Sequence, residues 1–341
     1  KRPCTCNFCI FPALLFLTVI TQPKRSVTMK MKVVFKNNPA AFCQLLTVSF
    51  AIVLLFFPFS FFSQTLSEKD LAYFKKYEDS LYYFQKKVFH APNDSARFKD
   101  NAKFLRLWDE VLLNQLSFYY PFDSLKEVAR LVSSDKKVRI INWNVPRIDG
   151  THTYYGFVQW LNPKTNRYDL SELTDRSAGI KNPETYVGDN TKWFGMLYYS
   201  IITSNDYYTL LAWDGNDKLV TRKFIDILSF KKDGTPVFGK EVFKFPKRNP
   251  KRVMFEYSAK VVMSLRYNES FGAIVYDHLA AKDEFNDGQW QFYGPDFSYD
   301  ALVLKRGKWN YTPDVDVKNP RNKNDNVQRN RQKDKPIYAP K

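Results

Sequence analysis

The sequence after Pro121 is divided into short runs of β-forming residues, and this pattern constrains the fold more than any other feature of the chain. The runs are rich in Val, Ile, Tyr, Phe and Trp, and most breaks between them carry Gly, Asn or Asp, as tight turns require. Because short loops make neighbouring strands antiparallel, we expect a meander that closes into a barrel or folds into a sandwich. A propeller is the competing arrangement, but its blades need a repeat of about 40–50 residues, which we do not find. The eleven expected strands are residues 138–145, 151–161, 167–173, 193–203, 207–213, 219–230, 236–245, 252–267, 271–278, 299–304 and 308–311.

Two amphipathic helices are expected before this β region. Ser67 and Asp70 have the spacing of a helix N-cap, and the stretch His90-Ala91-Pro92-Asn93 separates the two helices. The second helix is expected to begin at Asp94 or Ser95. The sequence therefore predicts an α+β protein, with a helical hairpin over residues 64–120 and an antiparallel β domain over residues 121–317. Apolar residues at helical spacing form two stripes: Leu71, Phe74, Tyr77, Leu81, Phe84 and Val88, then Phe98, Ala102, Leu105, Trp108 and Leu112.

An apolar run from Leu45 to Phe62 follows Lys30, Lys32 and Lys36, and the first 63 residues contain no Asp or Glu. A basic stretch followed by an apolar stretch is typical of a secretory signal. We therefore interpret residues 29–63 as a signal peptide cleaved after Ser63, or as an uncleaved N-terminal anchor. Residues 1–28 are interpreted as an upstream or non-native extension. The expected location is the periplasm, the outer membrane surface or the medium.

All four cysteines (Cys4, Cys6, Cys9 and Cys43) precede the expected exported part. That part is therefore predicted to fold without disulfides, which its length allows. The spacing of Cys4, Cys6 and Cys9 fits no standard zinc pattern. We expect no metal and no other cofactor.

The formal charge of +17 lies mainly at the two ends of the chain, and residues 64–317 carry only about +4. Residues 318–341 contain eight Lys or Arg and two Asp, with few apolar residues, and are predicted to be a disordered basic tail. Contact of this tail with anionic lipid or polysaccharide is a secondary interpretation. Because the positive charge is not gathered on a fold, no nucleic-acid partner is expected. Membrane contact is expected only through residues 45–62, if they remain attached.

Three segments of the β region resemble stretches of a protein family: residues 152–160 (HTYYGFVQW), 207–217 (YYTLLAWDGND) and 291–302 (QFYGPDFSYDAL). The similarity is to uncharacterised exported proteins of Bacteroidetes-type bacteria, and it extends over roughly residues 120–316. It implies export. The family has no assigned activity, so the resemblance implies no catalytic residues.

The usual catalytic patterns are weak in this chain. His90, His152 and His278 share no metal-ligand spacing, and a triad around His278 would lack a Gly-x-Ser-x-Gly elbow. Asp214-Gly215-Asn216-Asp217 groups oxygen-bearing side chains, but it is short for a calcium loop and is expected to be a hairpin turn. The long irregular segments 174–192 and 280–296 are where we expect function to lie.

Residues 289–299 (QWQFYGPDFSY) are the sharpest candidate for a site. Sugar recognition uses flat aromatic rings that stack on the sugar and carboxylates that accept hydrogen bonds from its hydroxyls. Trp290, Tyr293, Asp296 and Tyr299 are the predicted ligand-binding residues. The alternative is that these rings are ordinary core of a β domain.

We expect an envelope or secreted protein that acts as a non-catalytic binding or structural module, with a glycan or another envelope component as partner. The alternative is a glycan-acting hydrolase that uses paired carboxylates among Asp277, Asp283, Asp296 and Asp300, with Asp277, Asp296 and Asp300 as first choices. In an enzyme two carboxylates should converge in a cleft and one should have a raised pKa. In a binding protein they should be spread out or should cap turns. A third interpretation is a membrane-tethered assembly subunit, which requires that residues 45–62 stay attached.

Overall fold

The computed structural model describes residues 66–316, and in this range two helices precede fifteen strands. Helix α2 (Glu68–Phe89) begins with the predicted cap, in which Ser67 Oγ accepts a hydrogen bond from the Asp70 amide at 3.2 Å. Helix α3 (Asp94–Leu112) begins after Asn93, whose side chain accepts from the Ala96 amide at 2.9 Å. The predicted helical hairpin is confirmed. The signal or anchor, the extension and the basic tail lie outside the described residues.

The strands form three sheets, in which all pairs but one are antiparallel. In the first sheet the order is β1 (Ala129–Val132), β2 (Val138–Pro146), β3 (His152–Asn162) and β4 (Arg167–Thr174). In the second it is β5 (Gly188–Asp189), β9 (Pro236–Phe238), β8 (Val220–Phe230), β7 (Tyr208–Asp214) and β6 (Leu197–Thr203), and β11 (Val253–Ser258) also pairs with β8. In the third it is β10 (Phe243–Lys244), β15 (Lys308–Thr312), β14 (Tyr293–Lys305), β13 (Ala273–Ala281) and β12 (Leu265–Asn268), and β10 runs parallel to β15.

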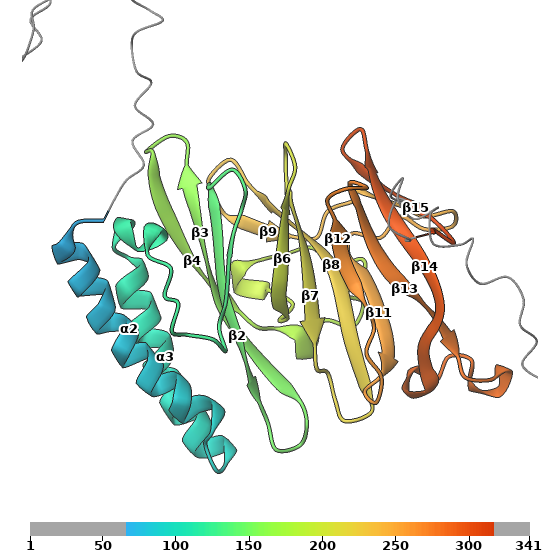
Figure 1. The fold of residues 1–341 in the computed structure, drawn as a ribbon, viewed down its shortest axis with the longest axis horizontal. Coiled ribbons are helices and arrows are strands. Elements are labelled where there is room, and N and C mark those ends of the chain that lie inside the picture. The colour runs from blue at the N-terminus through green and yellow to red at the C-terminus, as the bar shows by residue number, and fades with distance from the viewer. Residues whose placement is uncertain (1–65, 317–341) are drawn as a thin grey trace, which may run out of the picture. The chain divides into compact units, whose positions relative to one another are not determined.

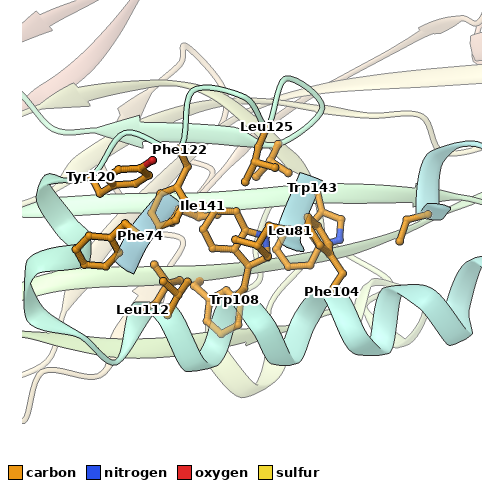
Figure 2. Packing of buried hydrophobic residues seen from close by; sticks show 14 of the residues in the cluster. Phe74, Leu81, Phe104, Trp108, Leu112, Tyr120, Phe122, Leu125, Ile141 and Trp143 are labelled. Carbon is orange, nitrogen blue, oxygen red and sulfur yellow. The ribbon is translucent and has the colours of Figure 1, made fainter. Parts of the chain in front are cut away.

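Helices and sheets are stacked as four layers (Figure 1). The helices cover one face of the first sheet, where Phe104, Trp108 and Trp143 pack in a single cluster (Figure 2). Neighbouring residues of β2 serve two cores, because successive side chains of a strand point to opposite faces. Ile141 packs against the helices, whereas Ile140 joins the cluster between the first and second sheets.

The same alternation joins the second sheet to both of its neighbours. On β8, Phe224 belongs to the cluster shared with the first sheet, and Ile225 belongs to the cluster shared with the third. Ile274 and Leu302 of the third sheet pack in the same cluster as Ile225. A sheet that is buried on both faces reads as a nearly continuous apolar run, as β8 does between Phe224 and Leu228.

The α+β class is confirmed, and of the two expected sheet arrangements the layered one is found and not a closed barrel. Two expected strands are each divided between sheets: residues 236–245 contain β9 and β10, and residues 252–267 contain β11 and β12. The short strands β1 and β5 were not expected from the sequence. No helix in residues 66–316 combines the length and the apolar character that a membrane crossing requires.

Candidate functional site

The predicted aromatic segment lies at the third sheet, on the loop between β13 and β14 and on the first half of β14. The loop contains two short 3-10 turns, η4 (Glu284–Asn286) and η5 (Trp290–Phe292). Its large apolar side chains are not sealed inside: Trp290 is 40% exposed, and Phe285 and Phe297 are almost fully exposed. The alternative interpretation, that these rings are ordinary core, is therefore wrong for Trp290, Phe292 and Phe297.

A bulge in β14 projects Phe297 out of the sheet. Asp277 pairs with Tyr299 and Leu279 with Pro295, so His278 faces the three residues 296–298. Phe297 has a φ of 71°, an unfavourable conformation for an aromatic residue. Asp296 Oδ1 accepts from the Ser298 amide at 3.0 Å and from its hydroxyl at 2.8 Å. Partial burial opposes ionisation of Asp296, but the bonds from Ser298 outweigh it and lower the pKa of this carboxyl.

His278, Asp300 and Tyr311 form a hydrogen-bonded cluster beside the bulge. His278 Nδ1 and Tyr311 Oη each lie 3.0 Å from Asp300 Oδ2, and the Asp314 amide donates to Asp300 Oδ1 at 3.1 Å. The bond to Asp300 raises the pKa of His278 above its usual value. The other ring nitrogen of this half-exposed histidine has no partner among residues 66–316, so it can meet a ligand.

These groups line a cleft of about 450 Å³ with aromatic walls. The rings of Phe245 and Tyr311 stack with centroids 5.1 Å apart, and those of Phe255 and Tyr276 lie 4.7 Å apart. Residues of the third sheet and of β11 therefore share the cleft. Its lining comprises Phe245, Pro246, Lys247, Arg248, Phe255, Tyr276, Asp277, His278, Leu279, Asp300 and Tyr311.

The structure brings some of the predicted site residues together and separates others. Asp277 and Asp300 line the same cleft, and Asp277 Oδ2 also accepts from the Ser264 amide at 2.7 Å. Asp283 lies on the loop, where it accepts from Asn286 at 2.6 Å. Trp290 packs on Tyr293 with centroids 4.7 Å apart. Tyr299 packs instead in a small cluster with Ala273, Val275 and Ala301.

A larger cavity lies between the ends of the first and second sheets. The long segment 174–192, where we expected function, lines part of it, but none of the predicted site residues does. It measures about 840 Å³, and Asp214 is its most buried carboxylate. Asp214 Oδ1 accepts from Tyr154 Oη at 2.7 Å and from the Asn216 amide at 2.8 Å. Burial outweighs these bonds and raises the pKa of Asp214. The sequence places Asp214 in a turn, but it does not show that the side chain is buried or that it bonds to Tyr154, far away in the sequence.

Arg222 holds a second carboxylate at this cavity. Its Nε donates to Glu256 Oε1 at 2.8 Å, and its Nη1 lies 3.9 Å from Asp214 Oδ2. His152 also lines the cavity. Its Nδ1 lies 2.9 Å from the side-chain nitrogen of Asn144, and burial lowers the pKa of His152. Burial therefore favours the neutral form of His152, whereas the bond to Asp300 favours the charged form of His278.

No protein family, curated protein or solved structure matches this chain. Within residues 66–316, no group of three or more His, Cys, Asp or Glu side chains is arranged to hold a metal ion.

Proposed function

We propose that this chain is an exported, non-catalytic module of the cell envelope that binds a glycan through the cleft at the third sheet and the aromatic loop beside it. The observation that carries the proposal is the exposure of Trp290, Phe292 and Phe297 on the β13–β14 loop and on β14. Strands β13 and β14 also supply Asp277, His278 and Asp300 to the cleft. Large exposed rings next to polar groups are typical of interaction surfaces, and sugar rings stack on such faces.

The state of the carboxylates supports binding over proton transfer. Asp296 caps a turn and has a lowered pKa, and both oxygens of Asp300 already accept hydrogen bonds. A general acid needs a raised pKa and a free proton position. Carboxylates that are fixed in this way are poorly suited to donate a proton, so the exposed rings supply the main contact with a sugar.

Export is supported by the basic and apolar pattern of residues 30–62. The intact mass of the exported protein tests this part. A mass that corresponds to a start at Gln64 supports cleavage, and the full mass supports an N-terminal anchor. Retention of the protein inside the cell would contradict export.

The binding proposal is tested with the full chain against a panel of soluble polysaccharides and peptidoglycan fragments, by affinity electrophoresis and calorimetry. The double variant Trp290→Ala/Phe297→Ala is expected to lose about tenfold or more in affinity, because stacking contributes roughly 0.5–1.5 kcal/mol per aromatic pair. Tyr83→Ala is the matched control, because Tyr83 is also exposed but lies on α2. Equal affinity of the double variant and the control would contradict the proposed surface.

A glycan hydrolase is the second candidate, and the placement of Asp277 and Asp300 in one cleft favours it. It predicts release of reducing ends from a bound polysaccharide. Asp277→Asn and Asp300→Asn should each reduce this release at least a hundredfold if the two carboxylates catalyse it. Binding without release of reducing ends supports the non-catalytic module.

A further inference from the structure

The cavity between the first and second sheets is built from segments that are distant in the sequence. The β2–β3 turn and the start of β3 supply Arg147 and His152, the segment after β4 supplies residues 175–183, and β7, β8 and β11 supply Asp214, Arg222 and Glu256. Its volume of about 840 Å³ lies within the range of small-molecule pockets, roughly 300–1,000 Å³. The cavity has room for a ligand much larger than a simple ion.

The acceptor groups of this cavity are largely occupied by protein donors. Asp175 Oδ2 accepts from the Tyr154 amide at 3.0 Å, and its Oδ1 accepts from the amide and hydroxyl of Ser177 at 2.9 and 2.5 Å. Asp214 Oδ1 has two donors, and Glu256 Oε1 is bound to Arg222. The three carboxylates therefore offer few oxygens to a ligand.

The donor groups are largely unoccupied. The side chains of Arg176 and Lys181 line the cavity and form no hydrogen bond or ion pair with any residue in the range 66–316. Arg147 lies 4.0 Å from Asp149, and its guanidinium lies over the Phe98 ring at 5.4 Å. Arg222 keeps N–H groups beyond the one bound to Glu256. A complementary ligand must therefore bring acceptors and negative charge.

The remaining lining sets the nature of the rest of the ligand. Phe194, Ile180 and Met254 provide apolar surface, and Thr153 provides a hydroxyl. The hydroxyl of Thr151 donates to Asp149 Oδ1 at 2.6 Å and can still accept a hydrogen bond. A guanidinium pairs best with the planar oxygens of a carboxylate or with a phosphate. We propose that this cavity binds a small organic anion, a carboxylate or phosphate carried on a hydroxylated body. This second site is independent of the glycan cleft.

The proposal is tested by calorimetry on the full chain with three probes that share one sugar ring: D-glucuronate, α-D-glucose 1-phosphate and D-glucose. We expect at least one charged probe to bind with a dissociation constant below 1 mM, and D-glucose to bind at least tenfold more weakly. The two charged probes distinguish a carboxylate from a phosphate. Failure of both charged probes to bind at 10 mM, or equal binding of D-glucose, would overturn the proposal.

The double variant Arg176→Gln/Lys181→Gln is expected to weaken the charged probe at least tenfold without affecting folding, since both side chains are exposed. The matched control is Arg167→Gln, an exposed arginine paired with Asn162 at the opposite end of β3 from His152. Unchanged affinity in the double variant, or an equal loss in the control, would overturn the site. Trp290→Ala/Phe297→Ala should leave this binding unchanged, which separates its outcome from that of the glycan cleft.

Discussion

Asp226 on β8 and Arg252 next to β11 form an ion pair in which neither side chain is exposed to solvent. Arg252 Nε lies 2.9 Å from Asp226 Oδ1, and Arg252 Nη2 donates to Asp226 Oδ2 at 3.0 Å. Tyr198 Oη donates to the same Oδ2 at 3.1 Å. The guanidinium also lies over the Phe194 ring at 5.6 Å. The pair therefore links β8 to the residue that precedes β11, in the layer that lies between the other two sheets.

We expect Arg252→Met to be strongly destabilising, because it leaves the charge of Asp226 buried without its partner. Removal of one member of a buried pair costs about 3–5 kcal/mol. The free energy of unfolding in urea, compared with the wild type, measures this loss.

The matched control is the double variant Asp226→Leu/Arg252→Met, which removes both charges. It should be more stable than Arg252→Met alone, because replacement of a whole buried pair by apolar side chains is often close to neutral. If the single and double variants were equally unstable, the loss would come from packing and not from the unpaired charge.

Glu78 is a second buried charge, and it ties α2 to the segment that follows α3. It is 5% exposed, and it accepts hydrogen bonds from Tyr120 Oη at 2.7 Å and from the amide and hydroxyl of Ser124, both at 2.8 Å. Burial opposes the ionised form, but the three hydrogen bonds outweigh it and lower the pKa of Glu78. The folded state therefore favours the carboxylate more than the unfolded chain does.

This pKa shift predicts a pH dependence of stability. Because the folded-state pKa of Glu78 lies below its unfolded value near 4.5, its stabilisation is present above pH 4.5 and is lost as pH falls through the folded value. Glu78→Gln should cost about 1–3 kcal/mol at pH 7 and less at pH 3. Urea unfolding at both pH values measures this difference. An equal loss at pH 3 and pH 7 would mean that the charge of Glu78 contributes nothing.

The helices could be predicted from the sequence because their signals are local. Ser67 and Asp70 cap α2 as their spacing suggested, and the predicted stripe residues Phe74 and Leu81 are buried. The stripe was still incomplete, because Glu78 and Gln85 on the same helix are also buried. A polar residue at a core position is recognised only when its partners are known, and those of Glu78 are more than forty residues away.

The division of the strands among three sheets could not be predicted, because the breaks carry apolar residues. Residues 259–264 separate β11 from β12, yet they include Val261 and Val262, which read as strand and are exposed. The break between β9 and β10 is different, because it contains Gly239, which has a φ of +90°. A glycine at this place is a signal for a strand end that the sequence does show. Local sequence specifies the direction of a strand but not which neighbour it pairs with.

The burial of the candidate site residues could not be predicted from local sequence either. Residues 289–299 could be selected by composition, but only the structure distinguishes the exposed Phe297 from the packed Tyr299. Burial raises the pKa of Asp214, and a turn motif contains no information about how deeply its side chain is buried.

The pKa of His278 should lie above the ordinary value of a histidine, and the pKa of His152 should lie below it. The hydrogen bond that His278 Nδ1 donates to Asp300 raises the pKa of His278, and burial lowers that of His152. NMR titration of the ring protons measures both. Asp300→Asn should bring the pKa of His278 down and leave the pKa of His152 unchanged.

Any stabilisation from charged His278 is present below pH 6.5 and is lost as pH rises through its folded pKa. A lower pKa for His278 than for His152 would contradict the arrangement.

Gly234 and Gly307 both have positive φ values, +93° and +72°, but their surroundings differ. A Cβ on Gly234 would collide with the ring of Trp160, which stacks on Phe230 with centroids 5.0 Å apart. A Cβ on Gly307 would meet open space. Gly307→Ala should therefore cost about 1–2 kcal/mol from backbone strain alone. Gly234→Ala should cost a further 1–3 kcal/mol or so, because the aromatic stack must move. Urea unfolding of the two variants measures this difference, and equal losses would mean that Trp160 does not lie against the turn.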